Sequence, residues 1–307
     1  IPYGNAADVR VQEKPGEYEV SFTPHPHGGP ECLWFCFRVS QVGTRDPARP
    51  RMRLVLRCQE NMLGGGQPSA MRPVVRRQGG VWERLGPGSA EPLPDGRNNA
   101  VWTIDTPVPV MDVAYCYPYG PDEIAALIRD TQGYWKTDTI GISPQGRPIV
   151  RLANRYGSPG AEEPGLYLMA RQHSGETPGS WVLDGLLRHM TTLGDAAPLI
   201  WVVPLANIDG VMQGDYGKDN FPYDLNRAWG QVPMRHETLL IQRDMQRWAK
   251  RCRPALAADF HAPGACETDG IYCFRVSPQH APREHEATLP WTTAIRASVD
   301  ARYCAPN

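Results

Sequence analysis

The sequence has no long apolar run and no excess of charge of either sign. No stretch of about 18 apolar residues occurs, so we predict no membrane-spanning helix. The 32 basic and 33 acidic side chains give a formal net charge of −1, and no block of like charge forms a basic patch. Such a patch is typical of proteins that bind nucleic acid or anionic membranes. We therefore expect neither partner, and we expect local groups to recognise the substrate.

The first residues and the cysteines bear on the compartment in which the protein resides. Its start, Ile1-Pro2-Tyr3, has neither an initiator Met nor the basic-then-apolar layout of a secretory signal, so we expect the natural N-terminus upstream. Several of the eight cysteines lie in apolar, strand-like runs such as residues 33–36 and 114–116. A free thiol acts there as a small hydrophobic group. Because disulfides persist mainly outside the cytosol, we predict reduced cysteines and a cytoplasmic protein.

The first 118 residues carry the pattern of short strands. Residues 18–22 and 52–57 alternate between apolar and polar side chains, as half-buried strands do, and residues 33–39 are aromatic and β-branched. Clusters of proline and glycine separate these runs. We therefore predict an antiparallel β-sandwich domain over residues 1–118.

From Pro121 onward, helical patterns alternate with apolar strands. The predicted elements are helices at 121–128, 178–187 and 237–250, and strands at 165–170, 199–203 and 255–260. This order is typical of a sheet with helical crossovers. We therefore predict a second domain of the α/β class over residues 119–307.

Three residues that can bind a metal follow two of these strands. His173 and Glu176 lie on the turn after strand 165–170, and His261 directly follows strand 255–260. Open α/β sheets build their sites at the carboxyl ends of strands, so the three side chains can converge if the strands are neighbours. Two His, one Glu and a water form a ligand set of hydrolytic zinc sites. The sequence therefore predicts one Zn²⁺ ion at His173, Glu176 and His261.

A third motif, Asp224-Leu225-Asn226-Arg227, follows strand 199–203 and a polar loop. An Arg beside an Asn suits a carboxylate ligand, because the guanidinium fork can bind both oxygens. Asp224 can accept the ring N–H of a zinc-bound His and so fix its tautomer. Each motif alone also permits a structural interpretation: an ion pair for Arg227, a salt bridge for Glu176, and hydrogen-bonded structural roles for both His.

Together these motifs resemble the carboxypeptidase A clan of zinc peptidases, and specifically its cytosolic carboxypeptidase branch. The resemblance covers both predicted domains and rests on residues 34–40, 113–119, 170–181, 207–210, 224–227 and 259–261. It implies a β-sandwich followed by a carboxypeptidase-like α/β domain with a mixed central sheet. It also implies a zinc-dependent hydrolase that releases one amino acid from the C-terminus of a peptide or protein.

The resemblance further implies roles for residues outside the metal site. Asn226 and Arg227 match the family's residues that hold the terminal carboxylate of the substrate. The family's general-base Glu lies on a late strand, so we expect it beyond Asn307, with Glu267 as a weaker candidate. The family's oxyanion-stabilising Arg is replaced here by Gly217, and the neighbouring Lys218 is the candidate donor.

Two other functions remain open. One is a zinc amidohydrolase that acts on small acylated amino acids, and the other is a catalytically silent protein that keeps the metal. A Glu on a late apolar strand favours an enzyme over the silent protein. A further histidine motif, His25-Pro26-His27, is predicted to be a loop rather than a second metal site, because proline stiffens it and no third ligand is evident.

Overall fold

The computed structural model describes residues 1–27, 29–43, 46–61, 66–105, 107–218, 222–262 and 270–304. Two compact units make up the chain, Ile1–Ala262 and Pro263–Asn307. Within the described residues, no helix is both long enough and apolar enough to cross a membrane. The predicted domain boundary after residue 118 falls inside the first unit and stays a prediction.

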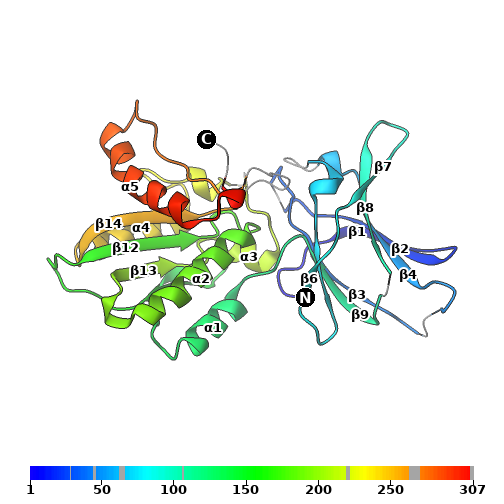
Figure 1. Cartoon of the computed structure of the whole chain (residues 1–307), viewed down its shortest axis with the longest axis horizontal. Coiled ribbons are helices and arrows are strands. Elements are labelled where there is room, and N and C mark those ends of the chain that lie inside the picture. Colours follow the sequence, from blue (N-terminus) through cyan, green and yellow to red (C-terminus); the bar gives the residue numbers. More distant parts are fainter. Residues whose placement is uncertain are drawn as a thin grey trace. The chain divides into compact units, whose positions relative to one another are not determined.

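Two β-sheets account for the strands of the first 114 residues (Figure 1). One has the strand order β1-β2-β4-β8-β7 and the other β3-β9-β5-β6. All neighbouring strands are antiparallel except β2 and β4, which are parallel because the chain forms β3 in the other sheet between them. The strands are β1 Ala7–Lys14, β2 Glu17–Thr23, β3 Cys36–Ser40, β4 Arg51–Leu56, β5 Val74–Arg77, β6 Trp82–Arg84, β7 Ser89–Pro92, β8 Asn98–Ile104 and β9 Val110–Ala114; the 3₁₀ turns are η1 Gln59–Asn61 and η2 Pro68–Ala70.

Aromatic side chains join these two sheets. The ring of Phe22 on β2 lies 5.1 Å from that of Phe35 and 4.6 Å from that of Phe37, measured between centroids. Phe22 and Phe35 are both buried. Aromatic rings contribute large apolar areas to a core, so this contact holds the two sheets together.

A buried carboxylate lies at the centre of the second sheet. Asp112 on β9 is flanked in register by Arg38 on β3 and Arg76 on β5. Its oxygens accept hydrogen bonds from Arg38 Nε at 2.6 Å and from Arg76 Nη2 at 2.8 Å. Burial opposes the charge of Asp112, but these two guanidinium groups outweigh burial and lower its pKa. The cluster therefore ties three strands together through one charged group.

A mixed five-stranded sheet forms the rest of the first unit, with the order β10-β11-β13-β12-β14. Strands β12, β13 and β14 are mutually parallel, whereas β10 and β11 are antiparallel to their neighbours. The strands are β10 Lys136–Ile142, β11 Pro148–Ala153, β12 Pro164–Ala170, β13 Leu199–Val203 and β14 Arg253–Phe260. The three strands predicted at 165–170, 199–203 and 255–260 are therefore confirmed.

Four α-helices accompany this sheet: the first precedes β10, and the other three lie between its parallel strands. They are α1 Pro121–Asp130, α2 Thr177–Leu193, α3 Ile208–Gln213 and α4 His236–Ala249, with the 3₁₀ turns η3 Gly194–Ala196 and η4 Leu225–Arg227. Helix α2 packs against β12, β14 and α1, and α4 packs against β10 and β12 (Figure 1). Tyr167 of β12 makes an edge contact with Trp248 of α4, with ring centroids 5.6 Å apart. The helices predicted near residues 121, 178 and 237 are confirmed, although α2 extends six residues past the predicted end.

The register of β12 and β14 decides where the site can form. Ala170 pairs with Phe260, so the carboxyl ends of both strands lie at the same level of the sheet. The residues that follow each strand therefore emerge side by side. This brings the segment after residue 170 close to the segment after residue 260.

The second unit is described from residue 270 to residue 304. It contains helix α5 Pro282–Ser298 and the 3₁₀ turn η5 Ala301–Tyr303. An isolated bridge pairs Ile271 with Cys304. Each cysteine that the structure describes, in either unit, has a free thiol.

Candidate metal centre

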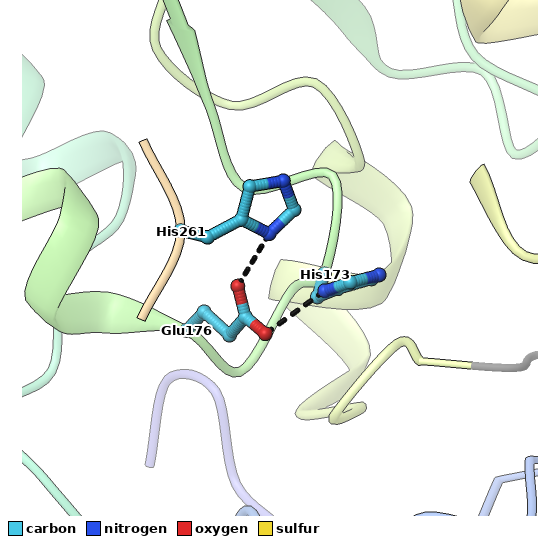
Figure 2. Close-up of side chains that lie close together, drawn as sticks. All are labelled: His173, Glu176 and His261. Carbon is cyan, nitrogen blue, oxygen red and sulfur yellow. Dashed lines mark hydrogen bonds and ion pairs between the residues drawn. The ribbon is translucent and has the colours of Figure 1, made fainter. Parts of the chain in front are cut away.

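Three predicted ligands, His173, Glu176 and His261, meet at the carboxyl ends of β12 and β14. Nδ1 of His173 lies 2.9 Å from Oε1 of Glu176, and Nδ1 of His261 lies 2.8 Å from Oε2 of the same carboxylate. Figure 2 shows both rings turned toward this carboxylate. The ligand atoms lie within 4.8 Å of one another. The structure thus brings together the three residues that the sequence singled out.

The start of α2 explains why Glu176 and His261 are so close. Glu176 is the N-cap of this helix, where the helix dipole favours a negative charge. In the first turn, a Cβ on Gly179 would lie 2.5 Å from the carbonyl oxygen of Phe260 and 2.6 Å from that of His261. Only glycine lets the end of β14 pass this near to the helix. Consequently the backbone N–H of Ala262 reaches Oε2 of Glu176 at 3.1 Å.

A buried arginine shapes the turn that carries the first two ligands. Arg171 has a positive φ of 65° and a fully buried side chain whose guanidinium donates to the carbonyl oxygens of Ser174 and Tyr119. Burial lowers the pKa of Arg171 to about 10. Because this pKa is still well above 7, the buried guanidinium keeps its positive charge beside the turn. Sequence patterns gave no signal for this role, because it depends on the contact with Tyr119, which is 52 positions away.

The outer nitrogen of each His faces a second carboxylate. Nε2 of His261 is hydrogen-bonded to Oδ2 of Asp259, and Nε2 of His173 lies 3.3 Å from Oδ1 of Asp224. Nε2 of His173 is buried and makes no hydrogen bond within the described ranges. A carboxylate at the outer nitrogen orients a metal-bound His and leaves the inner nitrogen free for the ion. Both Nδ1 atoms, which face the shared point, are therefore the candidate donor atoms.

The electrostatics of the site favour a positive charge. Burial disfavours the charged form of His261, but its hydrogen bonds to Asp259 and Glu176 prevail and raise its pKa to about 10. In His173, too, burial is outweighed by the carboxylates of Asp224 and Glu176, and the pKa is raised. Burial raises the pKa of Glu176, but the two His lower it more, to about 2. Two imidazole nitrogens and one carboxylate in such a field suit a divalent cation such as zinc.

Asp259 is a site residue that was missed as such from the sequence. It precedes His261 by two residues and lies on the same face of the extended chain. Its Oδ2 also accepts a hydrogen bond from Nε2 of Gln172, whose Oε1 accepts one from Nε1 of Trp229 at 2.5 Å. The two-residue spacing between Asp259 and His261 was the only signal in the sequence for this contact. It could be interpreted only once the extended conformation at the end of β14 was known.

The predicted carboxylate-binding residues lie on η4, next to the metal ligands. Oδ1 of Asp224 accepts the backbone N–H of Asn226 at 2.8 Å, so one oxygen serves both the turn and His173. Arg227 is exposed. Among the described residues, its guanidinium makes one hydrogen bond, to the carbonyl oxygen of Asn226 at 3.4 Å, and no ion pair. The fork of Arg227 is thus available to a ligand, and the roles of Asp224, Asn226 and Arg227 stay predictions.

Lys218 forms an ion pair with a residue in the N-terminal part of the same chain. Its Nζ lies 3.2 Å from Oε1 of Glu31, whose side chain is buried. The oxyanion role predicted for Lys218 stays a prediction. Glu267, the weaker candidate for the general base, lies outside the described residues.

Comparisons with known proteins agree with the predicted family. No protein-family model matches the chain. Human cytosolic carboxypeptidase 6 is 28% identical over 246 residues, which cover 73% of this chain and 48% of that protein. Cytosolic carboxypeptidase 2 of Xenopus tropicalis is 27% identical over 69% of this chain and 25% of its own length. The chain therefore spans about half, or less, of the curated relatives that it matches.

Solved structures with the same fold are metallocarboxypeptidases. One from Pseudomonas aeruginosa, in complex with (2-guanidinoethylmercapto)succinic acid, has a TM-score of 0.69 at 22% identity and covers 88% of this chain and 69% of its own. One from Burkholderia cenocepacia has a TM-score of 0.65 at 21% identity, with 86% and 69% covered. The fold is thus the α/β fold of the carboxypeptidase A-like metallocarboxypeptidases, as predicted. The curated homologues are named cytosolic carboxypeptidases, in agreement with the branch that the sequence resembles.

Proposed function

We propose that this chain is a zinc-dependent metallocarboxypeptidase that hydrolyses the C-terminal peptide bond of a peptide or protein. The observation that carries the proposal is the convergence of both histidine Nδ1 atoms on the carboxylate of Glu176, with a further carboxylate at each outer nitrogen. The names of the curated homologues and of the structural neighbours support it. The free thiols and the relatives' names support the further proposal of a cytoplasmic protein.

In this proposal, His173, Glu176 and His261 hold one zinc ion. Bound there, zinc supplies Lewis-acid chemistry: it polarises the scissile carbonyl and lowers the pKa of water. Asp224 and Asp259 hold the two imidazole rings in the orientation that exposes Nδ1.

Asn226 and Arg227 are proposed to bind the terminal carboxylate of the substrate. The guanidinium of Arg227 is exposed, and its fork matches the two carboxylate oxygens. Because Asp224 contacts both the Asn226 backbone and His173, the bound carboxylate would be positioned relative to the metal. Lys218 is the proposed donor to the oxyanion, and its ammonium would then be shared with Glu31.

The test is a trimming assay followed by mass spectrometry. Peptides with free and with amidated C-termini are incubated with the zinc-loaded protein and with the His173→Ala variant. Zinc content is measured in both proteins. Loss of a single residue from free termini only, and only with the unsubstituted protein, would support the proposal.

The two alternatives predict different results in the same assay. A zinc amidohydrolase would leave the peptides intact and cleave small acylated amino acids. A silent metal-binding protein would retain zinc and cleave neither substrate. Failure of the unsubstituted protein to bind zinc would contradict all three.

A further inference from the structure

A short segment, residues 214–218, lies between two parts of the first unit. On one side is the N-terminal β region, which we define as residues 1–114 with their two sheets. On the other side is the turn that carries the proposed ligands His173 and Glu176. We call residues 214–218 the bridging segment.

On the inner side of the bridging segment, Oγ of Ser174 donates to the carbonyl oxygen of Asp215 at 3.0 Å, and the N–H of Gly175 donates to that of Tyr216 at 2.8 Å. Ser174 and Gly175 are the two residues between His173 and Glu176. The bridging segment therefore holds the peptide that separates the ligands.

On its outer side, the bridging segment is held by residues of the N-terminal β region. Nδ2 of Asn5 donates to the carbonyl oxygen of Gly214 at 2.8 Å, and this contact is buried. Nδ1 of His27 is paired with the carboxylate of Asp215. The ion pair of Lys218 with Glu31 is the third contact. Three positions of one five-residue segment are thus fastened to residues more than 180 positions earlier.

Steric fit leaves little room on either side of the bridging segment. Gly214 has a φ of +75°, and a Cβ there would lie 2.4 Å from the carbonyl oxygen of Gly4. Gly217 has a φ of +84°, and its Cβ would lie 2.4 Å from Oγ of Ser174. A side chain at Gly175 would meet Tyr216 at 2.7 Å and Trp34 at 3.1 Å. Since close-packed groups transmit small shifts, a displacement on the outer side reaches the ligand turn.

We propose that Asn5 and His27 are positioning residues for the metal centre and act through the bridging segment. This inference rests on the proposed function, because it concerns the same zinc site. Ligands must be held within about 0.5 Å of their working geometry, which requires support from the residues behind them. The contact of His27 with Asp215 also gives a role to the second histidine of the His25-Pro26-His27 motif. The N-terminal β region is then part of the machinery that shapes the site.

The experiment compares His27→Gln and Asn5→Ala with a matched control, His189→Gln, in the full chain. His189 is exposed on α2, and its imidazole makes no hydrogen bond or ion pair within the described residues. Zinc affinity is measured by competition with a chelator, and the visible spectrum of the cobalt(II)-loaded protein reports ligand geometry. Unfolding of the metal-free proteins is followed separately. We expect the two variants to bind zinc about fivefold to tenfold more weakly and to show an altered cobalt spectrum, with the control unchanged.

The outcomes separate this inference from the proposed function. Unchanged affinity and spectrum in the His27→Gln variant, even with a lowered melting temperature, would mean a purely structural role and would overturn the inference. Failure of the unsubstituted protein to bind zinc or cobalt would overturn the proposed function itself, and the inference with it. If Asn5→Ala does not fold, His27→Gln decides alone, because the ring of His27 is partly exposed and its loss leaves no cavity in the core.

Discussion

Oδ1 of Asp224 lies 3.3 Å from Nε2 of His173 and also accepts the backbone N–H of Asn226 at 2.8 Å. One oxygen atom therefore faces a proposed metal ligand and fixes the turn of the proposed carboxylate-binding residues. Its second oxygen, Oδ2, is buried and makes no hydrogen bond within the described residues. Asp224 is thus committed to these two neighbours, which makes it a sensitive point for mutation.

The Asp224→Asn substitution should weaken zinc binding about tenfold to a hundredfold, because an amide lacks the negative charge that orients the ring of His173 across the 3.3 Å between Oδ1 and Nε2. Turnover should fall as well. Zinc affinity by chelator competition is the direct measurement. Asp195→Asn is the matched control, since Asp195 is exposed on η3. Equal zinc affinity in Asp224→Asn and the unsubstituted protein would contradict the assigned contact.

Replacing Arg227 should impair binding of free C-termini. We expect Arg227→Ala to raise KM for such peptides at least tenfold and to reduce the preference for free over amidated ends. Arg227→Lys should recover part of the loss, because it keeps the charge but not the fork. Arg129→Ala, at an exposed position of α1, serves as control. A preference for free termini that survives Arg227→Ala would assign the carboxylate to another residue.

Two glycines of α2 should respond in opposite ways to alanine. A Cβ at Gly179 would lie 2.5 Å from a backbone oxygen of β14, so Gly179→Ala should destabilise the fold by about 1–3 kcal/mol. Gly185 has nothing within 4 Å of its Cβ position, so Gly185→Ala should stabilise it by about 1 kcal/mol. Chemical denaturation of the metal-free proteins gives both values. A Gly179→Ala variant that is as stable as the unsubstituted protein, or more stable, would contradict the close approach of β14 to this turn.

Acid should remove the stabilisation that Asp112 provides. Its pKa is lowered by Arg38 and Arg76 against the effect of burial, so its charge stabilises the native state above the unfolded-state pKa of about 3.9. This contribution is lost as the pH falls from that value through the lower native pKa. Asp112→Asn should cost about 1–3 kcal/mol at pH 7 and progressively less toward pH 3. Urea unfolding of both proteins at each pH tests this, and a difference that is independent of pH would contradict it.

Much of the fold could be predicted from the sequence, because buried parallel strands are continuous apolar runs. Strand β13 lies where residues 199–203 predicted it, and β12 and β14 deviate only at their first residues. The candidate ligands were found because each lies directly after such a strand or on the turn that follows it. By contrast, the parallel pairing of β2 with β4 depends on a crossover through the other sheet, which alternation of side chains does not encode.

The supporting residues of the site were harder to predict. Arg171 and Gln172 act through contacts that exist only after the strands have paired, and neither has a periodic signal. Gly179 and Gly217 are distinguished by what lies opposite them rather than by a turn motif. The sequence identified the residues that could bind zinc, whereas their donor atoms and the packing that holds them became evident only in the structure.

The pairing of β12 with β14 has a consequence for the order of folding. Glu176 and His261 are 85 positions apart in the chain, so their contact closes a long loop and forms after local structure has appeared. A chain in which β14 has not yet docked presents only two of the three proposed zinc ligands, His173 and Glu176. The ion would therefore bind tightly only after β14 has docked, and once bound it would slow the detachment of β14 from β12.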